Sequence, residues 1–314
     1  METKNEDTCL KIRSTRATVA AGLRLYMGNF RRIFYTTWLP ALLCALFSGV
    51  QSQMLIPAMA RTLATQANLA NGNIGEGLSE YLLLSCLSLL NIIAMLLFFS
   101  YTFHLLSRHR EEGIIPIPAK WLTKPDGRSL ARTVAVGIVW FVVSLAVMVV
   151  CSVVIGIGLG LKSMTTVGLG LLLGLVFAVL LLPLAYPSMR YLTTRDTRLF
   201  DLLGSGYRQG WRYWGYIFAV FFVVAIIFAI ILSVTTLPAI VLFTANIKAQ
   251  AGASIGDPLG MPEYMGWMSL LAFTLAGFIQ TYILQAAFMP AYYMTGSIEQ
   301  QEIQRNETKT NTLH

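Results

Sequence analysis

Residues 214–242 read WGYIFAVFFVVAIIFAIILSVTTLPAIVL, a stretch of 29 residues without a single Asp, Glu, Lys or Arg. A helix crosses the hydrocarbon core of a bilayer with roughly 20 mostly apolar residues, so this stretch is long enough to span it. Because backbone polar groups in lipid must be paired within their own segment, a helix is the expected form. Five other stretches share this character, so the sequence predicts six transmembrane helices at Ile33–Ile56, Tyr81–Leu106, Thr133–Leu159, Val167–Tyr186, Trp214–Leu242 and Trp267–Tyr293.

The composition of the whole chain also indicates an integral membrane protein. Of its 314 residues, 56% are hydrophobic and 12% are charged, whereas about 25% of the residues in soluble domains are charged. This composition excludes an ordinary soluble enzyme, a disordered chain and a coiled coil, and the alternating pattern of an outer-membrane barrel is absent from the sequence. The predicted fold class is an all-α polytopic membrane protein with six transmembrane helices and amphipathic interfacial helices on the cytoplasmic side.

Basic residues are concentrated in four of the seven segments that flank the predicted spans. The N-terminal segment, the second loop, the fourth loop and the C-terminal segment hold 20 of the 23 Lys and Arg residues, and the other three loops hold Arg61, Lys162 and Lys248. The positive-inside rule then places both termini in the cytoplasm. We expect a bacterial inner-membrane protein whose net charge of +8 attracts anionic lipid headgroups. The basic residues are too dispersed to predict nucleic-acid binding.

The chain is expected to form one membrane domain over residues 14–297, between disordered cytoplasmic tails at 1–13 and 298–314. Short matches predict three repeats within this domain, at 14–106, 118–192 and 198–297, each an amphipathic segment followed by two spans. Repeated units of this kind are common in membrane folds.

The matches between the repeats lie at their entrances and exits. The exits read Ser100-Tyr-Thr-Phe103, Pro183-Leu-Ala-Tyr186 and Pro290-Ala-Tyr-Tyr293. At the entrances, the first and third repeats match each other at identical spacing. The matching residues are Tyr26, Asn29, Phe30 and Arg31 in the first repeat and Tyr207, Gly210, Trp211 and Arg212 in the third. The second repeat has only a weak match there, at Arg128–Thr133.

Two basic segments precede spans and have the pattern of amphipathic helices. In Ala17–Phe34 the larger apolar residues recur at steps of three and four, which places them on one helical face, and Asp201–Tyr213 is similar. Such helices can lie along the inner leaflet with their arginines among the phosphates. The alternative is that each segment is a cytoplasmic extension of the span that follows. In either case we expect a basic rim for lipid headgroups, made of Arg24, Arg31, Arg32, Arg208 and Arg212.

The stretch Gly22-Leu-Arg-Leu-Tyr-Met-Gly-Asn-Phe-Arg-Arg-Ile-Phe34, followed by Trp38-Leu-Pro40, resembles the entrance of a bacterial family of six-helix inner-membrane proteins. That family includes the membrane domain fused to some glycerophosphodiester phosphodiesterases. The resemblance implies a six-helix membrane domain over Ser14–Ser297. It implies no catalytic residue, because the fused enzymes carry catalysis on a separate soluble barrel for which this chain has no room.

The predicted spans contain few groups that could perform chemistry. Without formal charges in the spans, the sequence predicts no catalytic, metal or cofactor site, and the four cysteines show no disulfide or metal-binding spacing. Neutral polar residues in or near spans predict hydrogen bonds between helices, with the lining of a substrate path as the alternative. These residues are Asn91, His104, Gln280 and Gln285.

Glycines are frequent at the end of the third span and the start of the fourth. The pairs Gly156/Gly160 and Gly170/Gly174 have the GxxxG spacing that lets helices approach closely. With only a short turn between these spans, we expect a tight antiparallel hairpin, and self-association through these glycines is the alternative.

Two functions follow from these observations. The first is a non-enzymatic membrane protein, a scaffold or accessory protein that binds lipids, a protein subunit or a second copy of itself through the basic rim. The alternative is a transporter or lipid-handling protein for a small or amphipathic substrate, without proton coupling through intramembrane carboxylates. No cofactor is expected.

Overall fold

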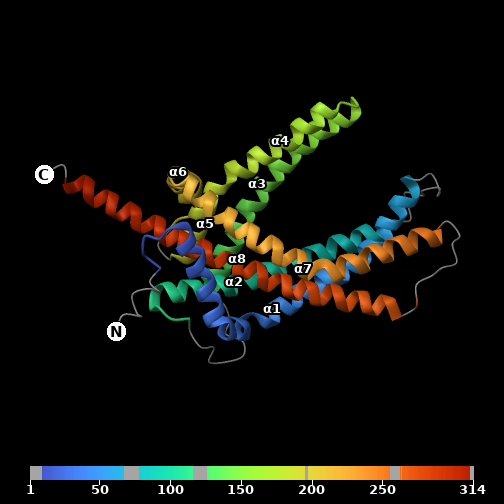
Figure 1. Ribbon diagram of the computed structural model, residues 1–314, viewed down its shortest axis with the longest axis horizontal. Coiled ribbons are helices and arrows are strands. Elements are labelled where there is room, and N and C mark those ends of the chain that lie inside the picture. The colour runs from blue at the N-terminus through green and yellow to red at the C-terminus, as the bar shows by residue number, and fades with distance from the viewer. Residues whose placement is uncertain are drawn as a thin grey trace. The chain divides into compact units, whose positions relative to one another are not determined.

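The computed structural model describes residues 9–66, 78–115, 126–194, 197–254, 262 and 264–311. These residues form helices and the turns between them, without a strand in any of these ranges (Figure 1). Six helices are long and apolar enough to cross a membrane, which confirms the all-α class with six spans. The long helices are α1 (Thr15–Gln66), α2 (Leu78–Glu112), α3 (Gly127–Gly160), α4 (Met164–Leu181), α7 (Trp214–Ser254) and α8 (Tyr264–Asn311), and the shorter ones are α5 (Ala185–Thr193) and α6 (Tyr207–Arg212).

The two amphipathic segments join their spans differently. The first segment is helical from Thr15 and belongs to the same helix, α1, as the span that follows it; the choice between the two interpretations of this segment stays a prediction. The second segment instead forms a π-helical turn at Leu202–Gly206 and then α6. Tyr213, whose N–H donates to the carbonyl of Gly210 at 3.2 Å, ends α6 before α7 begins.

The contacts of the chain divide it into two compact units, and the expected single membrane domain over residues 14–297 stays a prediction. Unit 1 comprises residues 1–33, 100–225 and 286–314, and unit 2 comprises 34–99 and 226–285. This division also cuts across the predicted repeats. α1, with 52 residues, contributes to both units.

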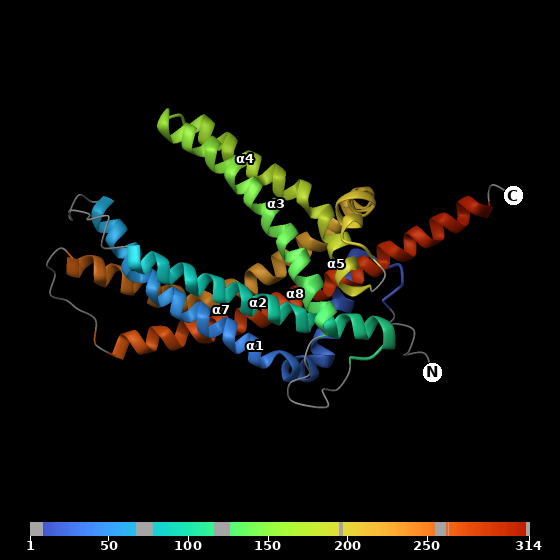
Figure 2. The ribbon, with the colours of Figure 1, turned by 180° about the vertical axis from the view of Figure 1, so that it is seen from behind.

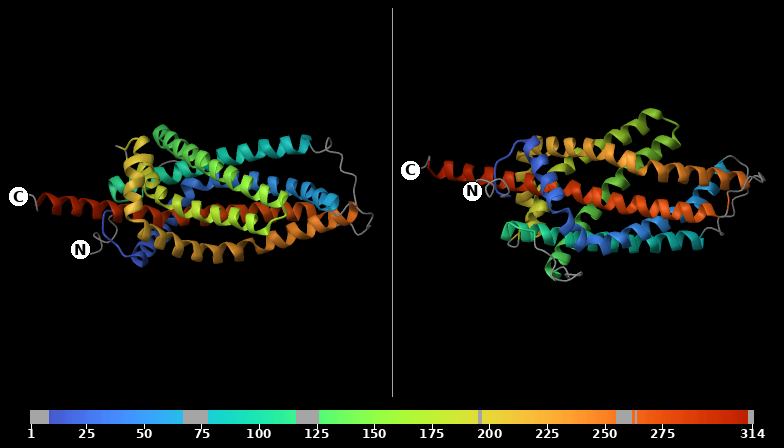
Figure 3. Two further views of the ribbon diagram at one scale, coloured as in Figure 1. Left: turned by 90° about the horizontal axis from the view of Figure 1, so that it is seen from above. Right: turned by 60° about the horizontal axis from the view of Figure 1, so that its bottom comes forward.

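Unit 2 is a bundle of the stretches that α1, α2, α7 and α8 contribute to it, which run side by side (Figure 3). Its main core is apolar and aromatic, with Cys44, Phe98 and Tyr282 buried together. The helices approach closely at Gly49, where an added Cβ would lie 3.1 Å from the backbone nitrogen of Thr274. These contacts bury the inward faces of the four helices, so charged side chains are excluded from the inward faces as well as from the outward ones.

In unit 1, α3 and α4 form the expected antiparallel hairpin (Figure 2). Gly170 lies in its interface, since an added Cβ would be 2.5 Å from the side chain of Ile155, and Gly174 is in ordinary contact distance of Cys151. Gly156 and Gly160 do not pack there, because no atom lies within 4 Å of a Cβ added at either. Gly158, on the opposite face of α3, packs against Val167 instead, so the predicted role of the first glycine pair within the chain is wrong.

The segment predicted as a disordered C-terminal tail is ordered as far as it is described. α8 continues to Asn311, and Ile298 and Glu299 are buried. In the N-terminal tail, Cys9 is buried against Gly296, whereas Leu10 and Ile12 are exposed. Both polar segments are held in place by contacts with residues that are distant in the sequence. A prediction from composition does not take such contacts into account.

Candidate functional site: an ionic cluster and cavity in unit 1

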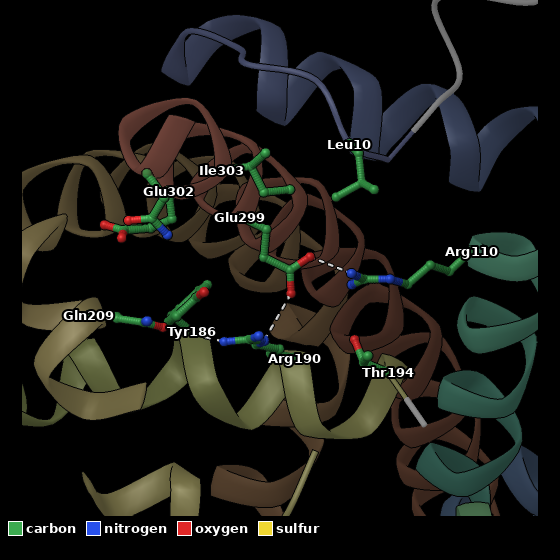
Figure 4. A pocket seen from close by; sticks show the side chains of 10 residues that line it. Leu10, Arg110, Tyr186, Arg190, Thr194, Gln209, Glu299, Glu302 and Ile303 are labelled. Atoms are coloured by element: carbon green, nitrogen blue, oxygen red, sulfur yellow. Dashed lines mark hydrogen bonds and ion pairs between the residues drawn. The ribbon is translucent and has the colours of Figure 1, made fainter. Parts of the chain in front are cut away.

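Glu299 of α8 is the centre of an ionic cluster in unit 1. Its carboxylate pairs with Arg110 from the last turn of α2 and with Arg190 of α5, whose Nε lies 3.2 Å from Glu299 Oε1. The side chain of Glu299 is 10% exposed, that of Arg110 15% and that of Arg190 38%. Figure 4 shows the carboxylate pointing toward both guanidinium groups. Three segments that are distant in the sequence are therefore held together by one acidic side chain.

Polar groups surround these ion pairs. Arg110 also donates to Thr193 Oγ1 at 3.4 Å, and Arg190 donates to Gln209 Oε1 at 3.3 Å. A cavity of about 280 Å³ lies beside the cluster (Figure 4). Its lining consists of Leu10, Arg110, Tyr186, Arg190, Thr194, Gln209, Glu299, Glu302, Ile303 and Asn306.

A second acidic residue, Glu302, lies one turn further along α8. It pairs with Arg212 at 2.9 Å and with Arg305 at 3.8 Å. Four guanidinium groups thus accompany two carboxylates, which leaves the cluster with a net charge of +2. A neighbouring cavity of about 340 Å³ shares Arg190 and Gln209 in its lining.

The N-terminal segment packs beside this cluster. The thiol of Cys9 donates to the backbone carbonyl of Tyr292 at 3.8 Å, and the hydroxyl of Tyr292 is 3.0 Å from His109 Nδ1. Arg13 lies over the ring of Tyr293, with 4.8 Å between its Cζ and the ring centroid. Burial raises the pKa of the Cys9 thiol, so this cysteine is a packing residue with low reactivity.

The entrances and exits of the predicted repeats meet in unit 1. The hydroxyl of Ser129 donates to the backbone carbonyl of Ser100 at 3.2 Å. A Cβ added at Gly210 would lie 2.3 Å from the carbonyl oxygen of Pro183, and one added at Gly22 would lie 2.4 Å from the nitrogen of Pro290. Each exit therefore contacts the entrance segment of another predicted repeat through the first residue of its exit motif, although the entrance residues differ, because Gly210 matches Asn29 and not Gly22.

The predicted rim residues lie at or near the surface of unit 1. Arg24, Arg31, Arg208 and Arg212 are exposed. Arg32 is half-buried and donates to the carbonyl of Ile115 at 3.0 Å. Large apolar side chains accompany these arginines: Met27 is 79% exposed on α1 and Phe200, before α6, is 89% exposed.

The predicted polar residues of the spans do not form one site. Asn91 and Gln280 are half-buried and Gln285 is buried, all in unit 2, whereas His104 is half-buried in unit 1. None of the four lines the cavity beside Glu299. One hydrogen bond between helices of unit 2 joins two residues outside this predicted set: Asn246 Nδ2 donates to Ser269 Oγ at 2.7 Å.

Sequence reasoning missed Glu299, Arg110 and Arg190. The prediction counted only basic residues and treated the segment after the last span as disordered. The sequence does contain a signal for this cluster: charged residues of opposite sign follow the ends of three predicted spans. Charged residues at the same depth in the membrane are expected to pair with one another. Comparison with known protein families, with curated proteins and with solved structures finds no match to this chain.

Proposed function

We propose that this chain is a non-enzymatic integral protein of the bacterial inner membrane, with both termini in the cytoplasm, whose basic rim binds anionic lipid headgroups. In this role it is a scaffold or accessory protein. The observation that supports the proposal most strongly is the pairing of exposed arginines with exposed apolar side chains on two segments that adjoin apolar helices, Arg24 and Met27 on α1 and Arg208 and Trp211 on α6.

This combination suits a membrane surface better than water. An arginine near an anionic leaflet gains about 1 kcal/mol of attraction, while a neighbouring apolar side chain gains by leaving water. Arg24 and Arg208 form no ion pair within the described ranges of the chain. Their charges are therefore available to lipid phosphates.

The same surface leaves room for partners. The rim is compatible with a protein subunit that carries acidic or aromatic groups at the membrane surface. It is equally compatible with a second copy of the chain that presents such groups. We propose no nucleic acid partner, because the basic residues adjoin apolar helices rather than form a continuous basic groove.

Lipid retention tests the proposal directly. The full chain is purified in a neutral detergent after exposure to an equal mixture of phosphatidylglycerol and phosphatidylcholine, and bound lipids are measured by mass spectrometry. We expect preferential retention of phosphatidylglycerol, lost in a variant with Arg24→Gln, Arg31→Gln and Arg208→Gln. The matched control carries Arg61→Gln, Lys162→Gln and Lys248→Gln, which removes the same number of charges from the three loops outside the predicted rim. Equal retention of both lipids by the unmodified chain, or no change in the triple variant, would contradict the proposal.

A further inference from the structure

The neighbouring cavity of unit 1, with a volume of about 340 Å³, is lined by α5, by α6 and by the described part of the segment between them. Most of the side chains in its lining are polar. They include Tyr191 of α5 and Arg198, Asp201 and Ser205 of the connecting segment. Because charged groups and hydroxyls can hydrogen-bond to a ligand, a lining of this kind suits a polar ligand rather than an apolar one.

Close backbone packing holds the wall of this cavity in place. The π-helical turn at Leu202–Gly206 meets α5 at its last residue, where a Cβ added to the glycine would lie 2.6 Å from Pro187 Cβ and 2.6 Å from the carbonyl oxygen of Asp201. Turns of the π type are rare in proteins and occur frequently at functional sites. The cavity is therefore bounded by a specific feature of the backbone and does not arise from loosely packed side chains.

Two exposed side chains of opposite charge line this cavity without pairing with each other. The guanidinium of Arg198 and the carboxylate of Asp201 form no ion pair within the described ranges of the chain. The carboxylate accepts one hydrogen bond, from the backbone N–H of Arg198 at 3.2 Å, and it does not cap the turn that follows. One cationic and one anionic group are therefore available to the same ligand.

The rest of the lining adds no net charge. Arg190 is already paired with Glu299 and donates to Gln209, so its charge is compensated from outside the cavity. The hydroxyls of Ser205 and Tyr191 make no hydrogen bond to other described residues. A lone anion or a lone cation would meet an opposing charge next to its partner, whereas a ligand with both charges would match both groups.

We infer that this cavity binds a zwitterionic group made of a phosphate and a primary ammonium, with the phosphate at Arg198 and the ammonium at Asp201. A guanidinium matches a phosphate in a bidentate manner. A primary ammonium has three N–H donors, which the carboxylate and the hydroxyls of Ser205 and Tyr191 can accept. Phosphoethanolamine is a group of this class, and it occurs both as a lipid headgroup and as a soluble compound. The site goes beyond the proposed rim, because none of these four residues belongs to the rim.

Binding measurements on the full chain in a neutral detergent test this inference. Isothermal titration with phosphoethanolamine, and separately with short-chain phosphatidylethanolamine, gives the affinity of each source. Loss of a hydrogen bond to a charged group lowers affinity by about tenfold or more, so we expect this loss in Arg198→Gln and in Asp201→Asn. The Asn side chain keeps an oxygen that can accept from the backbone N–H of Arg198, so the turn is preserved. The control Arg128→Gln changes an exposed arginine outside the cavity and should bind like the unmodified chain.

The outcomes separate the two sources from failure. Saturable binding of phosphoethanolamine that weakens in both cavity variants supports a soluble ligand, and the same result with phosphatidylethanolamine alone supports a lipid headgroup. The inference is overturned if neither probe binds, or if Arg198→Gln or Asp201→Asn binds as tightly as Arg128→Gln. Inorganic phosphate that binds as tightly as phosphoethanolamine would also overturn it, because the ammonium would then contribute nothing. The rim variants leave all four residues of this site unchanged, so either proposal can fail while the other stands.

Discussion

At the scale of single residues, Glu299 has the largest expected effect on stability. Glu299 forms ion pairs with both Arg110 and Arg190. The side chains of Glu299 and Arg110 are largely buried, and that of Arg190 is partly exposed. Removing one partner of a buried ion pair leaves an uncompensated charge, which costs about 3–5 kcal/mol when burial is complete. Solvent screening reduces the cost here, because Arg190 is partly exposed.

We therefore predict that Glu299→Gln lowers the free energy of unfolding by about 2 kcal/mol. Its control is Glu307→Gln, which changes an exposed carboxylate on the same helix. Thermal unfolding of both variants in the same detergent gives the comparison. Identical melting temperatures for the two variants would show that the cluster contributes nothing to stability.

Cys9 allows a second prediction at this scale. The thiol is buried and its pKa is raised above the ordinary 9.0 by burial, so little reactive thiolate is present near neutral pH. In a chain whose other cysteines are replaced by alanine, we predict that Cys9 reacts with N-ethylmaleimide at least tenfold more slowly than the exposed position in Lys11→Cys combined with Cys9→Ser. A raised pKa also means that the rate at Cys9 continues to increase with pH above 9.0. Equal rates at the two positions would indicate that Cys9 is not packed on α8.

At the scale of helices, the contacts between predicted repeats follow a cycle. Ser100, Pro183 and Pro290 occupy the same position of the three exit motifs, and they are contacted by Ser129, Gly210 and Gly22 respectively. The repeat itself stays a prediction. On the entrance side the contacting residues are not equivalent, because Gly210 matches Asn29 and not Gly22 in the comparison of the repeats.

The close approach of α1 to α8 gives the test at this scale. An added Cβ at Gly22 meets the backbone of Pro290, which cannot move as a flexible side chain would, whereas Gly28 on the same helix faces open space. We predict that Gly22→Ala destabilises the protein by about 1–3 kcal/mol. Gly28→Ala should be neutral or stabilising by up to about 1 kcal/mol, through helix propensity. Unfolding in detergent measures both, and a Gly22→Ala variant as stable as Gly28→Ala would mean that the helices do not approach as described.

At the scale of the whole molecule, local composition was sufficient to predict the spans, while contacts distant in the sequence were not predictable. The run at 214–242 identifies a spanning helix by itself, since lipid solvation acts on each segment separately. The pairing of Glu299 with Arg190, and the helix that carries Glu299 beyond the last span, depend on residues more than 100 positions apart. Likewise, GxxxG spacing identified α3 and α4 as closely packed but could not decide which face of α3 meets α4.

The four basic segments predicted on the cytoplasmic side all belong to unit 1. Unit 1 also contains the turn at Lys162, so this grouping does not assign a side of the membrane, and the cytoplasmic location of the four segments stays a prediction of the positive-inside rule. The turn at Lys162, between α3 and α4, is then predicted to reach the periplasm.

Labelling of single cysteines in intact cells tests this topology most directly. In a chain whose native cysteines are replaced by alanine, Lys162→Cys and Lys309→Cys are exposed in turn to a maleimide that cannot cross membranes. We predict that the cysteine at position 162 is labelled in intact cells, whereas the cysteine at position 309 is labelled only after the membrane is opened. Labelling of position 309 in intact cells, with position 162 protected until lysis, would contradict the account.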